Sequence, residues 1–113
     1  MARTTFSGPV ASTNGFIGGT GATMTAVLKA SSTIDFTSIS ANTTSDSSGI
    51  TVTGAEVGDP VIVGVPATIA AGLVVTGYVS AADTVKVRAA NVTASPVDPA
   101  SGTYTVTVIK ATA

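Results

Sequence analysis

The sequence predicts an all-β protein: a single β-sandwich, immunoglobulin-like or jelly-roll-like, with about seven short strands and an extended N-terminal arm. Three observations support this prediction. Valine, threonine, serine, alanine and glycine dominate the composition, which suits strands joined by tight turns and disfavours long helices. Apolar and polar residues alternate in several short runs. Turn-forming residues separate these runs at intervals of roughly 8–12 residues.

The most regular alternation lies in Gly72–Asn91, which we interpret as a β-hairpin at the core of the domain. Residues 80–83 form its short loop. The row predicted to face the core comprises Leu73, Val75, Gly77, Val79, Val85, Val87 and Ala89. The opposite face carries Tyr78, Lys86 and Arg88, which places a phenol ring near two cations. This face is either an ordinary solvated surface or a contact surface for a partner.

Four strands are expected before this hairpin and one after it. The first covers residues 22–30, with Met24, Ala26 and Leu28 on one face, although a short helix also fits. The others comprise residues 33–39 with Ile34 and Phe36 toward the core, residues 49–53 with Ile50 and Val52 inward, residues 60–65, and residues 103–110 with Tyr104, Val106 and Val108 on one face. Residues 60–65 are almost entirely apolar, so we expect them to be buried on both faces or at a sheet interface.

Turn-forming and polar residues fill the connections between these strands. Residues 40–48 form a predicted polar turn, and residues 66–71 cross to the hairpin with at most one helical turn. Asn42 and Asn91 each begin an Asn-X-Thr glycosylation pattern. Because we identify no secretory signal, we interpret both matches as chance.

The N-terminal region differs in composition from the rest of the chain. We divide the sequence into an arm over residues 1–28 and a β-sandwich domain over residues 29–113. The arm is rich in glycine, yet it holds two of the chain's three phenylalanines. Its candidate partner-binding residues are Phe6, Val10, Phe16 and Ile17. The arm either packs back on its own domain or docks into a neighbouring subunit or larger assembly, with the glycines as a hinge.

The composition disfavours most kinds of active site. The chain has no cysteine and no histidine, which removes the commonest metal ligands and the commonest general base. Charged residues are 10% of the chain and the formal net charge is −1, so we predict no nucleic-acid partner. The uncharged stretch Pro60–Ala82 contains several glycines and β-branched residues, so we interpret it as two strands and predict no membrane partner. We expect no enzymatic activity, cofactor or metal.

Two acidic residues, Glu56 and Asp59, lie close together in the connection over residues 54–60. They could supply half of a calcium site, which needs six or more oxygen ligands. No repeated acidic spacing supports that hypothesis, so a solvated acidic turn is the preferred interpretation.

Several short motifs resemble small structural proteins of tailed bacteriophages. They are Val52–Asp59, Tyr78–Arg88, Asn91–Ala94 and Asp98–Ala100. The opening Phe6–Val10, together with Asn14–Phe16, is similar to the N-terminal arm of phage head-decoration and head-fibre proteins. A proline often follows the Asp-Phe pair in that pattern, whereas Thr37 stands there in this chain.

The resemblance implies a capsid decoration, or cement, protein on the outer surface of a virion. Its partner would be the major capsid protein, engaged through a β-sandwich and the N-terminal arm. A homo-oligomer is implied, and a trimer is the expected number because seams between capsid units often have threefold symmetry. The alternative is a fibre or host-surface recognition module of a phage particle.

Overall fold

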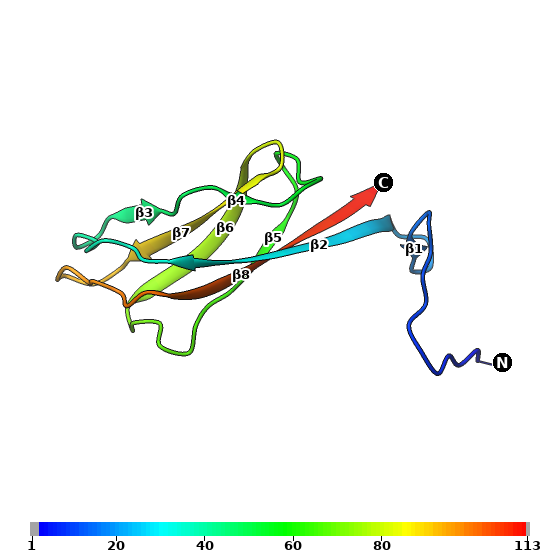
Figure 1. The fold of residues 1–113 in the computed structure, drawn as a ribbon, viewed down its shortest axis with the longest axis horizontal. Helices are drawn as coiled ribbons and strands as arrows, with labels where there is room; N and C mark the ends of the chain where they lie inside the picture. Colours follow the sequence, from blue (N-terminus) through cyan, green and yellow to red (C-terminus); the bar gives the residue numbers. More distant parts are fainter. Residues whose placement is uncertain (1–2, 113) are drawn as a thin grey trace.

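The computed structural model describes residues 3–112, which form two antiparallel β-sheets packed face to face (Figure 1). The strands are β1 (Phe16–Ile17), β2 (Thr23–Ile34), β3 (Thr44–Asp46), β4 (Ile50–Thr51), β5 (Val61–Gly64), β6 (Leu73–Ala81), β7 (Thr84–Asn91) and β8 (Gly102–Thr112). One sheet has the order β1-β2-β8-β5. In the other, β7 pairs with β6 along one edge and with β3 and β4 along the opposite edge. The predicted all-β sandwich is confirmed.

The longest pairing joins β2 to β8, from Thr23 opposite Thr112 to Ile34 opposite Gly102. Figure 1 shows this ribbon extending beyond the rest of the sandwich, with β1 at its far end. The molecule is accordingly elongated, with extents of 57 × 29 × 23 Å. Since β2 begins at Thr23, the region predicted as an arm, residues 1–28, includes the first half of this strand.

The core lies between the inner rows of the two sheets. The buried apolar side chains include Ile34, Phe36, Ile50, Val52, Val79, Val85, Val87, Ala89, Tyr104, Val106 and Val108. All of them were predicted to face inward from their period-two positions. The ring of Phe36 meets that of Tyr104 edge to face, with centroids 5.8 Å apart, a favourable aromatic geometry. Burial raises the pKa of the Tyr104 phenol.

Two predicted strand positions are wrong. Residues 35–38 are not in a strand, and Phe36 is buried from the connection that follows β2. β3 lies inside the segment predicted as a polar turn. Here Ser47 takes part in the pairing with β7: its backbone N–H donates to the Val87 carbonyl, and its Oγ accepts from the Val87 N–H. A serine side chain therefore replaces a backbone acceptor where the strand is interrupted.

The expected strand faces are corrected at two places. β5 was predicted to be buried on both faces or to lie at a sheet interface. The second alternative holds, because Val61 and Val63 pack against Gly77 of the other sheet while Ile62 is 58% exposed. Met24 was predicted to share a face with Ala26 and Leu28. A register shift between Met24 and Ala26 leaves Met24 on the surface, because an extra residue reverses the alternation of side chains. Residues 66–71 form a turn, in which the Ile69 N–H donates to the Pro66 carbonyl.

Asn91 is a buried polar residue at the end of β7. Its side-chain amide donates to the carbonyls of Ile39 and Ser95, and its Oδ1 accepts from the backbone and hydroxyl of Thr93. These bonds tie together the β2–β3 and β7–β8 connections at one end of the sandwich. The Asn-X-Thr pattern here is therefore explained by packing, because a buried amide with these partners is unavailable for glycosylation.

No helix within residues 3–112 is long and apolar enough to cross a membrane. The uncharged stretch discussed above contains β5 and β6. These strands pack together across the sandwich at Gly77, where an added Cβ would lie 2.6 Å from a methyl carbon of Val63 and 2.8 Å from one of Val61. Only glycine permits this approach of the two sheets.

Replacing Gly77 with alanine should therefore destabilise the fold by about 1–3 kcal/mol, as overpacking does in a well-packed core. Urea unfolding measured by circular dichroism tests this. Gly64→Ala is the matched control, because a Cβ at Gly64 would be no closer than 3.7 Å to its neighbours. Equal stability of the two variants would contradict the proposed close contact at Gly77.

Candidate interaction surface

The N-terminal arm presents large apolar side chains to solvent. Phe6 is 66% exposed and Val10 46%, on a segment with no strand or helix between residues 3 and 15. Phe16 and Ile17, which form β1, are 48% and 58% exposed. Side chains held in water add little to folding stability, so their concentration on one projecting segment makes that segment a candidate contact surface.

β1 joins the arm to the sandwich through a two-residue pairing with β2, Phe16 opposite Met24 and Ile17 opposite Thr23. Gly15 precedes it with φ of 91°, and a Cβ there would meet the Met24 carbonyl oxygen. Ser12 Oγ donates to the Gly15 carbonyl at 2.8 Å and holds the turn before β1. Gly15 is therefore required both for its dihedral angle and for the close approach to β2.

Exposed apolar residues of β2 extend this surface. Met24 and Val27 are 39% and 55% exposed. They border a shallow cavity of about 130 Å³ whose lining also includes Phe16 and Gly15. We call Phe16, Ile17, Met24 and Val27 the distal apolar patch. The alternation placed Met24 on one face with Ala26 and Leu28 and did not single out Val27, because the pattern does not reveal that the ribbon continues past the sandwich.

The second predicted group lies on the outer face of the other sheet. Arg88 and Asp46 form a bidentate ion pair, with Nε–Oδ1 2.7 Å and Nη2–Oδ2 3.0 Å. The Tyr78 hydroxyl donates to Asp46 Oδ2 at 2.6 Å, and the guanidinium carbon lies 4.6 Å from the centre of the Tyr78 ring. The predicted proximity of Tyr78 to Arg88 is confirmed. Asp46 was missed because it lies in the segment expected to be a turn.

This cluster shifts the pKa values of its members. The hydrogen bonds from Arg88 and Tyr78 lower the pKa of Asp46 to about 2. The bond to Asp46 raises the pKa of the Tyr78 phenol, and also that of the Arg88 guanidinium. Lys86, opposite Tyr78 in the strand pairing, is half-buried and adds a favourable charge for the ionised Asp46. The polar groups satisfy one another, which indicates a mainly structural role.

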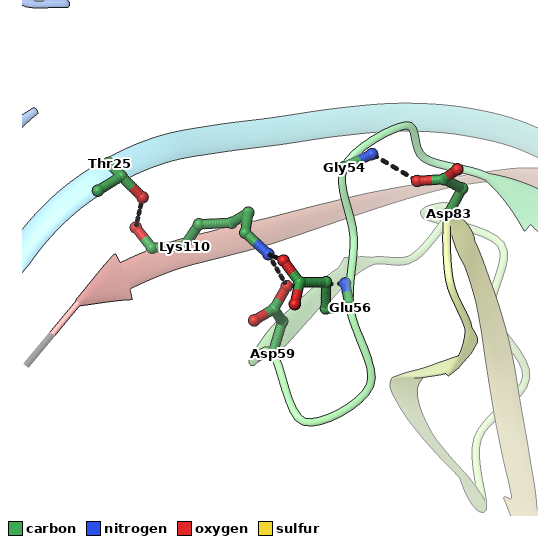
Figure 2. Close-up of polar contacts among 6 residues, drawn as sticks. All are labelled: Thr25, Gly54, Glu56, Asp59, Asp83 and Lys110. Carbon is green, nitrogen blue, oxygen red and sulfur yellow. Dashed lines mark hydrogen bonds and ion pairs between the residues drawn. The ribbon is translucent and has the colours of Figure 1, made fainter. Parts of the chain in front are cut away.

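A second polar cluster anchors the connection between β4 and β5, as Figure 2 shows. Lys110 Nζ contacts Asp59 Oδ2 at 2.7 Å and Glu56 Oε1 at 3.0 Å. The Glu56 N–H also donates to Asp59 Oδ2, at 2.9 Å. The bond from Lys110 lowers the pKa of Asp59, and the two carboxylates raise the pKa of Lys110. The acidic pair proposed as half a calcium site is thus engaged with a lysine of β8.

Asp83, in the turn between β6 and β7, holds the other side of the same connection (Figure 2). Its Oδ1 accepts from the Gly54 N–H at 2.7 Å, while its backbone N–H donates to the Ala55 carbonyl and its carbonyl accepts from the Val52 N–H. The residue has φ of 61°, a left-handed conformation that aspartate tolerates better than most residues. Within residues 3–112, no three acidic side chains gather closely enough to hold a metal ion.

The predicted partner-binding residues therefore fall into two separate groups. Phe6, Val10, Phe16 and Ile17 belong to the arm and β1, beside the sheet that contains β2 and β8. Tyr78, Lys86 and Arg88 belong to the opposite sheet. Only the first group exposes large apolar side chains, and it is the stronger candidate for a partner contact.

Comparison of the chain with protein-family models, curated proteins and solved structures finds no match.

The pKa of Asp46 makes stability depend on pH in a defined direction. Folding lowers this pKa from 3.8 to about 2, so the ion pair contributes fully above the unfolded pKa and is lost as the pH falls toward 2. Solvent screening limits the contribution to about 1 kcal/mol, since the Arg88 side chain is 47% exposed. Asp46→Asn should lower the free energy of unfolding near neutral pH, and the difference from wild type should shrink in acid.

Urea unfolding across this pH range is the measurement. Asp98→Asn serves as control, because Asp98 is exposed in a loop and forms no ion pair within the described residues. A difference between wild type and Asp46→Asn that stays constant down to the lowest pH would contradict the assigned pKa shift.

Proposed function

We propose that this chain is a structural protein of a tailed-bacteriophage virion, which decorates and stabilises the capsid as a homo-oligomer. The observation that carries the proposal is the exposed apolar surface of the arm and the distal apolar patch. The motif resemblance to head-decoration proteins supports the same function. In this proposal the sandwich is a rigid carrier, and the arm and patch contact the major capsid protein or a neighbouring subunit.

Energetic considerations favour many weak contacts acting together. Burying a large apolar side chain contributes roughly 1.5–3 kcal/mol, and the four arm and β1 side chains are already partly buried. Ordering an extended segment costs about 1 kcal/mol or more per residue. A single arm would therefore bind weakly. Linking several arms in one oligomer raises the overall affinity through effective concentration, which suits a protein that attaches at repeated positions on a shell.

The cluster around Lys110 supports the role of carrier. It fastens the β4–β5 connection to β8, one of the two strands of the ribbon that bears the arm. Thr25 Oγ1 of β2 also donates to the Lys110 carbonyl, at 3.2 Å, across the same ribbon (Figure 2). These contacts stiffen the base from which the distal patch projects. A rigid base reduces the entropy lost on binding, so more of the contact energy is available for affinity.

Removing residues 1–18 should leave a folded sandwich that no longer binds phage shells. The core residues lie outside this segment, whereas the arm and β1 contain four of the exposed apolar side chains. Co-sedimentation of purified protein with empty shells of the cognate phage measures binding, and circular dichroism checks the fold. Unchanged binding by the truncated protein would contradict the role of the arm.

A matched pair of full-length variants distinguishes a specific role of the arm in shell binding from a general effect of exposed apolar side chains. Phe6→Ser should reduce shell binding, whereas Val57→Ser, which alters an even more exposed residue outside the arm, should not. If the wild-type protein does not bind shells at all, the capsid proposal fails and the alternative of a fibre or host-surface module becomes the one to test.

A further inference from the structure

β6 forms an open edge of its sheet. It pairs with β7 along its length, and within residues 3–112 no strand pairs with its other side. The inner row of β7 is fully buried, whereas Leu73, Val75 and Gly77 in the inner row of β6 are only half-buried. A further strand beside β6 would complete the burial of this row.

The hydrogen bonds around β7 show which backbone groups of β6 point to the open edge. The Val92 N–H donates to the Gly72 carbonyl at 3.0 Å, and these two residues continue the register of β6 with β7. Hydrogen-bonded and non-bonded positions alternate along an antiparallel pair. Asn91, the last residue of β7, accordingly donates its N–H to the Thr43 carbonyl on the other side of the strand. The N–H and carbonyl groups that point to the open edge therefore belong to Leu73, Val75, Gly77 and Val79.

Other open edges carry features that oppose the addition of a strand, and β6 does not. β2 has a register shift near its start and the exposed charge of Lys29. β5 is four residues long and lies between Pro60 and Pro66. β6 has nine residues with no charge and no proline, and its register shifts only near its end. Because proteins use charges, prolines and bulges to prevent edge pairing, an edge without them is available for it.

The sequence of β6 is complementary to itself in the antiparallel orientation. When two copies pair around a two-fold axis at Thr76, Leu73 lies opposite Val79 of the second copy, and Val75 lies opposite Gly77. All four outward-pointing residues then exchange hydrogen bonds, whereas an axis at Val75 or Gly77 leaves one of them outside the set. The apolar inner row of one copy continues into that of the other. The same edge thus serves both copies, as a two-fold contact requires.

The outer face of β6 favours the same axis. Val74 is 52% exposed in the single molecule. In the pairing around Thr76 it lies opposite Tyr78 of the second copy, at a non-hydrogen-bonded position, where side chains come closest. An aromatic ring beside a β-branched side chain is a favourable cross-strand pair. The Tyr78 hydroxyl can keep its bond to Asp46, because that bond runs over its own sheet. The pairing therefore covers an exposed valine and places no two charges of β6 together.

We propose that two copies of this chain pair through their β6 edges, around a two-fold axis at Thr76, and form one continuous sheet across the dimer. The inference rests on the homo-oligomer of the proposed function and names its contact. It gives a dimer, whereas the resemblance to capsid proteins suggests a trimer. The dimer also joins two arms, which raises their combined affinity for a shell through effective concentration.

A cysteine at the axis tests the register, because the chain has no native cysteine. Thr76 faces its own copy at a non-hydrogen-bonded position, where Cα atoms lie about 4.5 Å apart, within the range that a disulfide spans. Full-length Thr76→Cys should form a disulfide-linked dimer on mild oxidation, measured by non-reducing electrophoresis. Thr51→Cys is the control, because Thr51 is an exposed threonine of β4, which lies across β7 from β6. Equal dimer yields would overturn the proposal.

Sedimentation equilibrium of the cysteine-free full-length protein measures the dimer itself. The wild-type protein should dimerise between micromolar and millimolar concentration. Val74→Glu should weaken dimerisation about tenfold or more, because it removes two symmetry-related contacts with Tyr78 and brings a carboxylate toward Asp46 of the second copy. Val92→Glu alters a 62% exposed valine outside β6 and should not weaken it. A monomer, a trimer, or equal effects of the two substitutions would overturn the proposal.

The arm provides the control that separates this contact from shell binding. Phe6→Ser, which is expected to reduce shell binding, should leave the dimer intact, because Phe6 lies outside β6. Loss of the dimer in Phe6→Ser would show that the arm makes the contact, and would overturn the pairing of β6. No shells are present in these experiments, so the dimer result and the shell-binding result can fail independently.

Discussion

The antiparallel pairing of β2 with β8 is the constraint on which the rest of the structure depends. On one side of this ribbon, Tyr104, Val106 and Val108 are fully buried against the other sheet. At its far end, the same ribbon carries β1 and the arm beyond the sandwich. A slip of one residue in this pairing would turn the buried row of β8 toward solvent. The core and the position of the candidate binding surface are therefore fixed by one register.

Most of the acidic residues stabilise the fold by joining distant segments of the chain. Asp46, Glu56, Asp59 and Asp83 are four of the six acidic residues, and each joins segments distant in sequence. Exposed ion pairs contribute little individually, so their main effect is to hold connections that have few apolar contacts. The candidate surface of the arm and β1 is consequently apolar. This division of roles suits an assembly protein, which needs broad contacts and a stable carrier.

The sequence predicts the core well because a residue's face follows from period-two alternation. The inward row of the hairpin and that of β8 needed no other information. The errors arise where a bulge interrupts the alternation, or where the position of a strand within its sheet decides whether its side chains are buried. Thr25 adds an extra residue to β2 and exposes Met24. β5 has the composition of a buried strand but lies at a sheet edge.

The candidate surface was predictable in part. Phe6, Val10, Phe16 and Ile17 were identifiable because aromatic and aliphatic residues are unexpected in a glycine-rich segment. Val27 and the open edge of β6 were not, because strand order and unpaired edges depend on long-range contacts that leave no local pattern. Asp46 was missed because it lies in a segment expected to be a turn and because its partners, Tyr78 and Arg88, are more than thirty residues away.

Hydrogen–deuterium exchange of the full-length protein, free and bound to cognate phage shells, tests the central claim most directly. That claim is that an exposed N-terminal segment binds the shell and is carried by a sandwich that does not change on binding. It predicts rapid exchange over residues 3–12 in the free protein, strong protection of the same residues on the shell, and unchanged protection in β7 and the inner part of β8. An arm that exchanges equally fast in the free and bound protein would contradict the claim.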